Sequence, residues 1–299
     1  MKKVLKIGYF ADGPWSHRAF DLIIADKSIM ISFIVPRTDS NDDTLYNYSE
    51  KHNIPYLKGI RINSFDFFEL AESYNCDLFV SMSFNQIFKP KITDLPRFGT
   101  INCHAGKLPF YRGRNILNWV LINDEKEFGI TVHFIDEGID TGDILLQRLF
   151  PITDNDTYFT LLETAYSECA SILYDSIKLI QSETFPRIRQ NEIHPVGFYC
   201  GMRDKGDEII DWNQTSRQIF NFIRSISIPG PRSLTSINGR PVFINKARMI
   251  DMAPEYISTI GQIVGKTKDG LLVKSKDTTI EILEIESEMK LKVGDRLGS

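Results

Sequence analysis

The stretch that decides the fold is Asp77-Leu78-Phe79-Val80-Ser81-Met82-Ser83, a short apolar run broken only by serine. Continuous runs of this kind are typical of strands buried on both faces of a parallel sheet. Similar strand-like runs precede it at Val4–Ala11 and Met30–Val35, and one follows it at Gly99–Cys103. Segments with helical spacing of apolar residues separate or follow these runs, the longest at Thr157–Ile180. The alternation predicts an α/β fold with a Rossmann-like, mostly parallel sheet and helices on both faces.

The last third of the chain has a different pattern. Proline and glycine punctuate the segment Thr184–Asp211, and one helical pattern follows at Ser216–Ser225. Short alternating runs separated by turns then continue to Thr279–Ile285, which predicts a small β-barrel-like (OB-like) domain. We therefore expect a catalytic domain over residues 1–185, a connecting region over 186–212 and the β domain over 213–299.

Composition limits the kind of partner. The 299 residues carry a formal net charge of −4, which argues against a nucleic-acid partner. No apolar run reaches the roughly 20 residues that span a bilayer, so no membrane partner is expected. The four cysteines are scattered without a ligand-like spacing, which favours reduced thiols in a cytoplasmic protein and predicts no metal site. The sequence leaves the oligomeric state open.

Two stretches carry chemistry. In Ile101-Asn102-Cys103-His104-Ala105-Gly106-Lys107-Leu108-Pro109-Phe110-Tyr111-Arg112-Gly113, a strand runs into a loop rich in glycine and proline. Because side chains alternate along a strand, Asn102 and His104 share one face and point into the same crevice. In the second stretch, Gly129–Ile144, a strand runs into a loop with several carboxylates, one of which can orient His104. His133, inside that strand, is interpreted as a packing or supporting residue.

These motifs, NxHxGxLPxYRG followed by GITVHxIDxGIDTGD, resemble the signature of N10-formyltetrahydrofolate-dependent formyltransferases. That family includes methionyl-tRNA formyltransferases and sugar N-formyltransferases, and the resemblance covers most of the chain. It implies that Asn102, His104 and Asp140 are the catalytic residues and that N10-formyltetrahydrofolate is the co-substrate. It also implies that the pterin is held largely by backbone of two loops. The residues implied there are Phe84, Asn85, Gln86, Ile87, Ile135, Asp136 and Gly138. Phe84 and Ile87 could equally belong to the core, and Asp136 and Asp143 could shape their loop without doing chemistry.

The acceptor is inferred from charge. Methionyl-tRNA formyltransferases carry a basic insertion after the second strand, whereas this chain has the short, acidic segment Arg37–Asp43, which would repel phosphates. From Lys205 to the end of the chain, basic and acidic residues nearly balance. The sequence therefore favours a nucleotide-linked amino deoxysugar of surface polysaccharide synthesis as acceptor. The candidate residues for binding it are Trp15, Ser16, Arg18, Lys107, Tyr111, Arg112 and Arg114. Methionyl-tRNA formyl transfer and a non-catalytic folate-binding role remain as alternatives.

Overall fold

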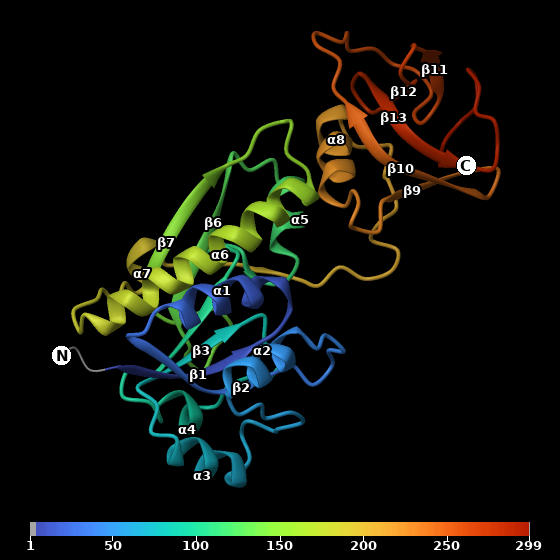
Figure 1. The fold of residues 1–299 in the computed structure, drawn as a ribbon. Helices are drawn as coiled ribbons and strands as arrows, with labels where there is room; N and C mark the ends of the chain where they lie inside the picture. The colour runs from blue at the N-terminus through green and yellow to red at the C-terminus, as the bar shows by residue number, and fades with distance from the viewer. Residues whose placement is uncertain (1–3, 299) are drawn as a thin grey trace. The chain divides into compact units, whose positions relative to one another are not determined.

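The computed structural model describes residues 4–298, and its first sheet has the strand order β2-β1-β3-β4-β6-β7 (Figure 1). The strands are β1 (Leu5–Ala11), β2 (Ile29–Val35), β3 (Leu78–Met82), β4 (Thr100–His104), β6 (Glu127–Phe134) and β7 (Ile144–Pro151). The pairs β1–β2, β1–β3 and β3–β4 are parallel, and β6 is antiparallel to β4. The predicted mostly parallel sheet is confirmed.

Helices cover both faces of this sheet, as predicted. Tyr9 of β1 faces Phe20 of α1 (Gly13–Ala25), with ring centroids 6.3 Å apart. The next residue, Phe10, packs from the opposite face against Phe67 of α3 (Phe65–Ser73), with centroids 6.0 Å apart. Helix α6 (Tyr158–Gln181) lies on the α1 side, because Lys178 donates to Asp26, the C-cap of α1, at 2.7 Å. Two further helices of this region are α2 (Thr44–His52) and α4 (Pro90–Thr93).

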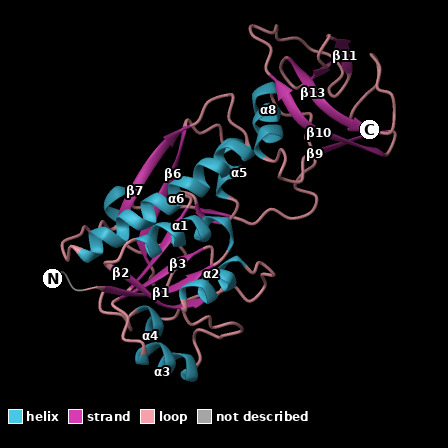
Figure 2. Cartoon of the chain, viewed as in Figure 1, coloured by secondary structure: helices cyan, strands magenta, loops and turns pink. Residues whose placement is uncertain are grey.

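The C-terminal sheet is antiparallel, with the order β11-β12-β13-β10-β9. Its strands are β9 (Ser233–Ile237), β10 (Arg240–Arg248), β11 (Ile263–Lys266), β12 (Leu271–Lys274) and β13 (Thr279–Ser287). Helix α8 (Ser216–Ser225) begins with a capping box between Thr215 and Gln218 and contributes Ile219 and Ile223 to the core. The predicted small C-terminal β domain is confirmed as an antiparallel sheet domain (Figure 2).

The chain divides into two compact units whose segments alternate along the sequence. One unit comprises the residues up to Arg114 with Phe128–Phe150 and Glu163–Cys200, and the other comprises Asn115–Glu127, Pro151–Leu162 and the residues from Gly201 on. Helix α5 (Ile116–Ile122) belongs to the second unit. The predicted domain limits stay a prediction. None of the described helices is both long and apolar enough to cross a membrane.

The predicted connecting region contains ordered elements that the sequence pattern did not indicate. They are α7 (Gln190–Ile193) and β8 (Tyr199–Cys200), and β8 pairs in parallel with the two-residue strand β5 (Arg112–Gly113). Elements of two to four residues carry too few positions for a period to be read, so contacts with distant segments decide them. This pairing places the end of the first motif beside the segment after α7.

Candidate active site

The first part of the site is the end of β4, where Asn102 and His104 lie on one face of the sheet. In the antiparallel register with β6, His133 is opposite Asn102 and Thr131 is opposite His104. Residues directly opposite each other on paired strands share a face, so two neighbouring strands present four polar side chains together.

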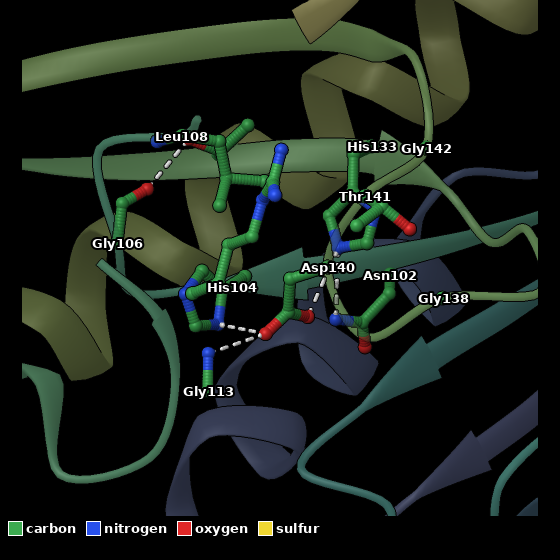
Figure 3. A network of polar contacts seen from close by, with 12 residues as sticks. Asn102, His104, Gly106, Leu108, Gly113, His133, Gly138, Asp140, Thr141 and Gly142 are labelled. Carbon is green, nitrogen blue, oxygen red and sulfur yellow. Dashed lines mark hydrogen bonds and ion pairs between the residues drawn. The ribbon is translucent and has the colours of Figure 1, made fainter. Parts of the chain in front are cut away.

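The carboxylate of Asp140, from the loop between β6 and β7, sits between two imidazoles (Figure 3). Its Oδ2 lies 3.6 Å from His104 Nδ1 and accepts the Gly113 N–H at 2.8 Å. Its Oδ1 lies 3.4 Å from His133 Nε2, and that nitrogen is also 3.4 Å from Asn102 Nδ2. The structure thus brings Asn102, His104 and Asp140 together in one polar network, and His133 joins the amide to the carboxylate.

The protons of the two histidines are set by backbone carbonyls. His104 Nε2 is 2.7 Å from the Tyr111 carbonyl oxygen, and His133 Nδ1 is 2.8 Å from the Phe134 carbonyl oxygen. Because a carbonyl only accepts, these two ring nitrogens carry the protons. In the neutral rings, the nitrogens that face Asp140 are therefore bare. A proton released at this point meets a bare nitrogen beside a carboxylate.

Burial and charge keep this pair ready to accept a proton. Burial lowers the pKa of His104, and this outweighs the opposing effects of Asp140 and the Tyr111 carbonyl. Burial alone would raise the pKa of Asp140. However, His104 and His133, which add positive charge beside it when they are protonated, and the Gly113 N–H hold the pKa of Asp140 well below its ordinary value. At neutral pH the site therefore combines a neutral imidazole with an ionised carboxylate.

The loop that carries Asp140 is held in a narrow shape. Asp140 has a φ of +55°, in the left-handed region that non-glycine residues seldom occupy. Asp136 Oδ1 accepts the Gly138 N–H at 3.1 Å and the Thr141 hydroxyl at 2.6 Å, which closes the turn before it. At Gly142 a Cβ would lie 1.9 Å from a carbonyl oxygen of β6, so only glycine fits. The Asp136 carboxylate thus shapes the loop, and the pterin-binding role implied for it stays a prediction.

Two supporting residues were not identified from the sequence. The Thr131 hydroxyl donates to the Gly106 carbonyl at 2.6 Å and accepts from Gln147 Nε2 at 2.8 Å. Gln147 also donates to the Leu108 carbonyl at 3.0 Å. Together they hold the loop after His104 against β6 and β7. The available signal was the position of Thr131, two residues before His133 and hence on the same strand face.

His133 is a supporting residue whose removal should slow the reaction without abolishing it. His133→Ala removes both contacts of Nε2, and at about 1 kcal/mol for each contact, kcat should fall about thirtyfold. Steady-state kinetics measure this, with unchanged thermal unfolding expected within a few degrees. A loss as large as that of His104→Ala would instead make His133 a reacting group.

The two loops implied for the pterin lie against one apolar cluster. Phe84 and Ile135 pack on this cluster around Phe10, which fits the core alternative for Phe84. Gln86 is engaged internally, because it accepts the Ile62 N–H at 3.1 Å and donates to the Ile60 carbonyl at 2.9 Å.

Of the three other residues of these loops, two are exposed and one has a buried oxygen without a hydrogen-bond partner. Ile87 is 69% exposed, and Gly138 is exposed. Asn85 donates to the Thr38 hydroxyl at 3.1 Å, whereas its Oδ1 is buried without a hydrogen-bond partner. A buried acceptor without a donor fits a ligand that brings N–H groups, as a pterin ring does.

The candidates on α1 lie toward α6. Ser16 is fully buried, and its hydroxyl donates to the Gly13 carbonyl at 2.9 Å. The first turn of the helix therefore uses that hydroxyl as a donor, and the substrate-binding role expected of Ser16 stays a prediction. Trp15 packs 4.6 Å from the Tyr166 ring, and Arg18 lies 3.6 Å from Glu163 Oε2. Both residues thus contact α6.

The candidates after His104 lie beside the catalytic network. The Tyr111 side chain is 4% exposed, and its carbonyl is the acceptor for His104. Arg112 is half-buried, and both Nε and Nη2 donate to Gln190 Oε1, at 3.1 and 2.6 Å. Arg114 is exposed and Lys107 is half-buried. This loop, more than α1, offers positive charge close to Asp140.

One group among residues 4–298 has ligand atoms close enough for a metal ion. Oxygen or nitrogen atoms of Asp12, His17 and Asp42 lie within 4.8 Å of one another, at the carboxyl end of β1. Burial lowers the pKa of His17, whose Nε2 lies 3.6 Å from Asp42 Oδ2. The predicted absence of a metal site stays a prediction.

Comparisons with known proteins agree with this architecture. Residues 50–176 match the formyl transferase family, and residues 203–294 match the formyl transferase C-terminal domain. A methionyl-tRNA formyltransferase of Pelotomaculum thermopropionicum is 32% identical over 247 residues, which cover 82% of this chain and 77% of that protein. One of Geobacter metallireducens is 33% identical, covering 84% and 79%.

Solved structures share the fold. The sugar 3N-formyl transferase WlaRD, determined with dTDP and 5-N-formyl-THF, aligns with a TM-score of 0.70 and 22% identity, covering 96% of this chain and 99% of that one. An N-formyltransferase of Helicobacter canadensis, in complex with folinic acid and dTDP-3-aminofucose, gives 0.69 and 24%, covering 95% and 100%. With two family domains matched in order and relatives above 30% identity over most of both chains, this chain belongs to the formyltransferase family.

Proposed function

We propose that this chain transfers the formyl group of N10-formyltetrahydrofolate to the amino group of a nucleotide-linked amino deoxysugar, in the cytoplasm and for surface polysaccharide. The observation that carries the proposal is the network in which a neutral His104 and an ionised Asp140 meet beside the Asn102 amide. An amide, an imidazole and a carboxylate are what an acyl transfer to an amine requires.

The bound folate supplies an activated formyl carbon, and the residues of the chain do the rest. The Asn102 Nδ2 group can donate to an oxygen that gains negative charge, an effect worth about 2.7–4 kcal/mol per donor. His104 Nε2 is occupied by the Tyr111 carbonyl, so only Nδ1 is left to face reacting atoms. That nitrogen takes a proton from the attacking amine, and the adjacent Asp140 carboxylate stabilises the resulting imidazolium. The imidazolium then returns the proton to the donor nitrogen of the folate as the bond from that nitrogen to the formyl carbon breaks.

The folate part of the proposal is supported by relatives and by an unused acceptor. The folate-bound structures named above share the fold of this chain over nearly its whole length. The unpartnered Asn85 Oδ1, on the loop after β3, would gain a hydrogen-bond donor from a pterin. Phe84 and Ile135 supply an apolar wall next to it.

The sugar nucleotide part rests on charge. In the segment Arg37–Asp43, the single arginine is paired by Asp39, with Nε and Nη2 each 2.8 Å from a carboxylate oxygen. This segment therefore offers no free positive charge to bind the phosphates of a tRNA. In the C-terminal unit, a cavity of about 420 Å³ has lysine and arginine in its lining but also Asp204, Asp207 and Glu208. Such mixed charge suits a small ligand better than a long polyanion.

A second function, formylation of methionyl-tRNA, is favoured by the sequence relatives, which are methionyl-tRNA formyltransferases at 32–33% identity. The two functions differ in acceptor and share the same donor and the same network. A non-catalytic folate-binding role has no observation in its favour.

One experiment separates these functions. The purified full chain is incubated with N10-formyltetrahydrofolate and a panel of 3-amino and 4-amino deoxysugar nucleotides, and with methionyl-tRNA in parallel. We expect formylation of at least one sugar nucleotide, detected as a mass increase of one formyl group. Formylation of methionyl-tRNA with no sugar modified would overturn the acceptor assignment, and no formylation at all would overturn both.

A further inference from the structure

The structure links the Arg112 guanidinium to the backbone of the Asp140 loop through one buried side chain, Gln190. We propose that Gln190 is a positioning residue that couples an anion bound at Arg112 to the position of Asp140. The acceptor's phosphates would then help to set the catalytic carboxylate. This inference rests on the proposed function in one respect, namely that the acceptor carries phosphate.

The side-chain amide of Gln190 uses all of its hydrogen-bonding capacity to join Arg112 to the Asp140 loop. Its Nε2 donates to the Asp140 carbonyl at 2.8 Å and to the Gly142 carbonyl at 2.9 Å. Its Oε1 accepts from Arg112 Nε and Nη2. An amide has two N–H groups and two lone pairs, so every capacity is used, at a residue that is 4% exposed. Such fully satisfied buried networks fix geometry.

The Gln190 side chain is itself held in place. Just before α7, Ile188 and Ile144 exchange backbone hydrogen bonds of 2.8 and 2.9 Å. This bridge ties the segment that carries Gln190 to the first residue of β7, directly after the Asp140 loop. The backbone of Gln190 is therefore held in place. A shift of the Arg112 guanidinium changes the position of the Gln190 side chain and, through it, the backbone of the Asp140 loop.

Both residues of β5 reach Asp140, by different routes. The Gly113 N–H donates to the Asp140 carboxylate at 2.8 Å, and Arg112 reaches the Asp140 carbonyl through Gln190. Asp140 needs such support, because its left-handed conformation is costly when nothing else fixes it. A shift of Arg112 thus acts on the side chain and on the backbone of the same residue.

Arg112 carries a charge that no described carboxylate neutralises. Within 4.0 Å of its guanidinium there is no Asp or Glu oxygen among residues 4–298, and its Nη1 has no acceptor there. The group is half-buried between the Tyr199 ring, 5.4 Å from Cζ, and Gly197, where a Cβ would lie 2.9 Å from Nη1. Half-buried positive charge without a counter-ion favours an anionic ligand, and a guanidinium suits phosphate.

The first test measures how well the backbone amides of the Asp140 loop are protected from exchange, with no reaction taking place. Amide hydrogen exchange over residues 136–142 is followed in the full chain with and without inorganic pyrophosphate. We expect pyrophosphate to slow exchange several-fold in the wild type, but not in Arg112→Ala or Gln190→Ala. Gln181→Ala, which removes a half-buried glutamine of α6, should behave as wild type. Equal protection in Gln190→Ala and in wild type would overturn the coupling, as would no protection in the wild type.

The second test is kinetic and compares an amino sugar with and without its nucleoside diphosphate. In the wild type, the phosphates should raise kcat about tenfold as well as lower KM. In Gln190→Ala and Gln190→Glu, they should lower KM only. Glutamate keeps an acceptor for Arg112 but removes the donors to the Asp140 and Gly142 carbonyls. Because its side chain has the same length as glutamine, the variant tests these two hydrogen bonds and not the filling of the space. A phosphate-dependent gain in kcat that survives in both variants would overturn the proposal.

The two proposals fail in distinguishable ways. Loop protection by pyrophosphate that depends on Gln190, together with no formylation of any sugar nucleotide, would remove the acceptor assignment and leave the coupling standing. Formylation of a sugar nucleotide, together with loop protection that is equal in Gln190→Ala and in wild type, would remove the coupling and leave the acceptor assignment standing. Thermal unfolding of each variant checks that a loss comes from the site and not from the fold.

Discussion

Asp140→Asn is expected to lower kcat by about 10³–10⁴-fold while the protein stays folded. Asparagine still accepts the Gly113 N–H but carries no charge, so the imidazolium formed on His104 loses its stabilising partner. The effect should fall on kcat, because nothing in the geometry gives the carboxylate a role in holding the unreacted acceptor. Steady-state kinetics with the identified acceptor measure it.

The matched control lies in the same loop. Asp143 has a half-buried carboxylate three residues further on, so Asp143→Asn makes the same change of charge without touching the network. Its kcat should stay within about twofold of wild type, in line with substitutions away from special features. If the two variants lose activity equally, the charge of the loop, and not the Asp140 carboxylate, is what matters.

His104→Ala is expected to lower kcat by about 10²–10⁴-fold. The variant removes the ring nitrogen that lies beside Asp140 Oδ2 and that we propose as the proton acceptor, and general acid–base help of this kind contributes about 10²–10⁴ in rate. His52→Ala, at the exposed end of α2, is the control and should keep wild-type kcat. Binding of folate, followed by fluorescence, should survive in both. Turnover above a few per cent in His104→Ala would exclude proton transfer through this ring.

The pH profile gives a second, independent readout for the same residue. His104 must be neutral to accept a proton, and burial lowers its pKa from the ordinary 6.5, so kcat should be flat near neutrality and fall only below 6.5. Because Asp140 opposes that lowering, Asp140→Asn should move the acid limb of the residual activity to still lower pH. A shift of that limb to higher pH would contradict the assignment of the limb to His104.

The same two groups make the folded state sensitive to acid. The unfolded chain binds a proton at His104 more readily than the folded chain does, so stability decreases as pH falls below 6.5. The pKa of Asp140 is also depressed on folding, and its contribution is lost as pH falls below 3.8. Both effects lower the stability of the folded state as the pH falls, and neither lowers it at neutral pH.

Local pattern was enough to predict the α/β sheet and the small C-terminal β domain, and the two motifs indicated Asn102, His104 and Asp140 as candidate reacting residues. A run as long as Asp77–Ser83 and the alternation of Asn102 with His104 are local properties, because strand and helix periods are set by neighbouring residues. The two motifs also carry Asp140 in a fixed order after His104. At Ser16, local pattern did not show that the hydroxyl donates within the first turn of its own helix.

The connections among Asn102, His104 and Asp140 depend on pairing between distant segments. His133 joins Asn102 to Asp140 because antiparallel pairing of β4 and β6 puts it opposite the amide, and no spacing within one segment fixes that register. Gln190 meets Asp140 from 50 positions away along the chain, out of a segment whose pattern indicated only a connection. Hydrogen bonds between distant segments depend on where the whole chain folds, so residues that hold a site are harder to read than residues that react in it.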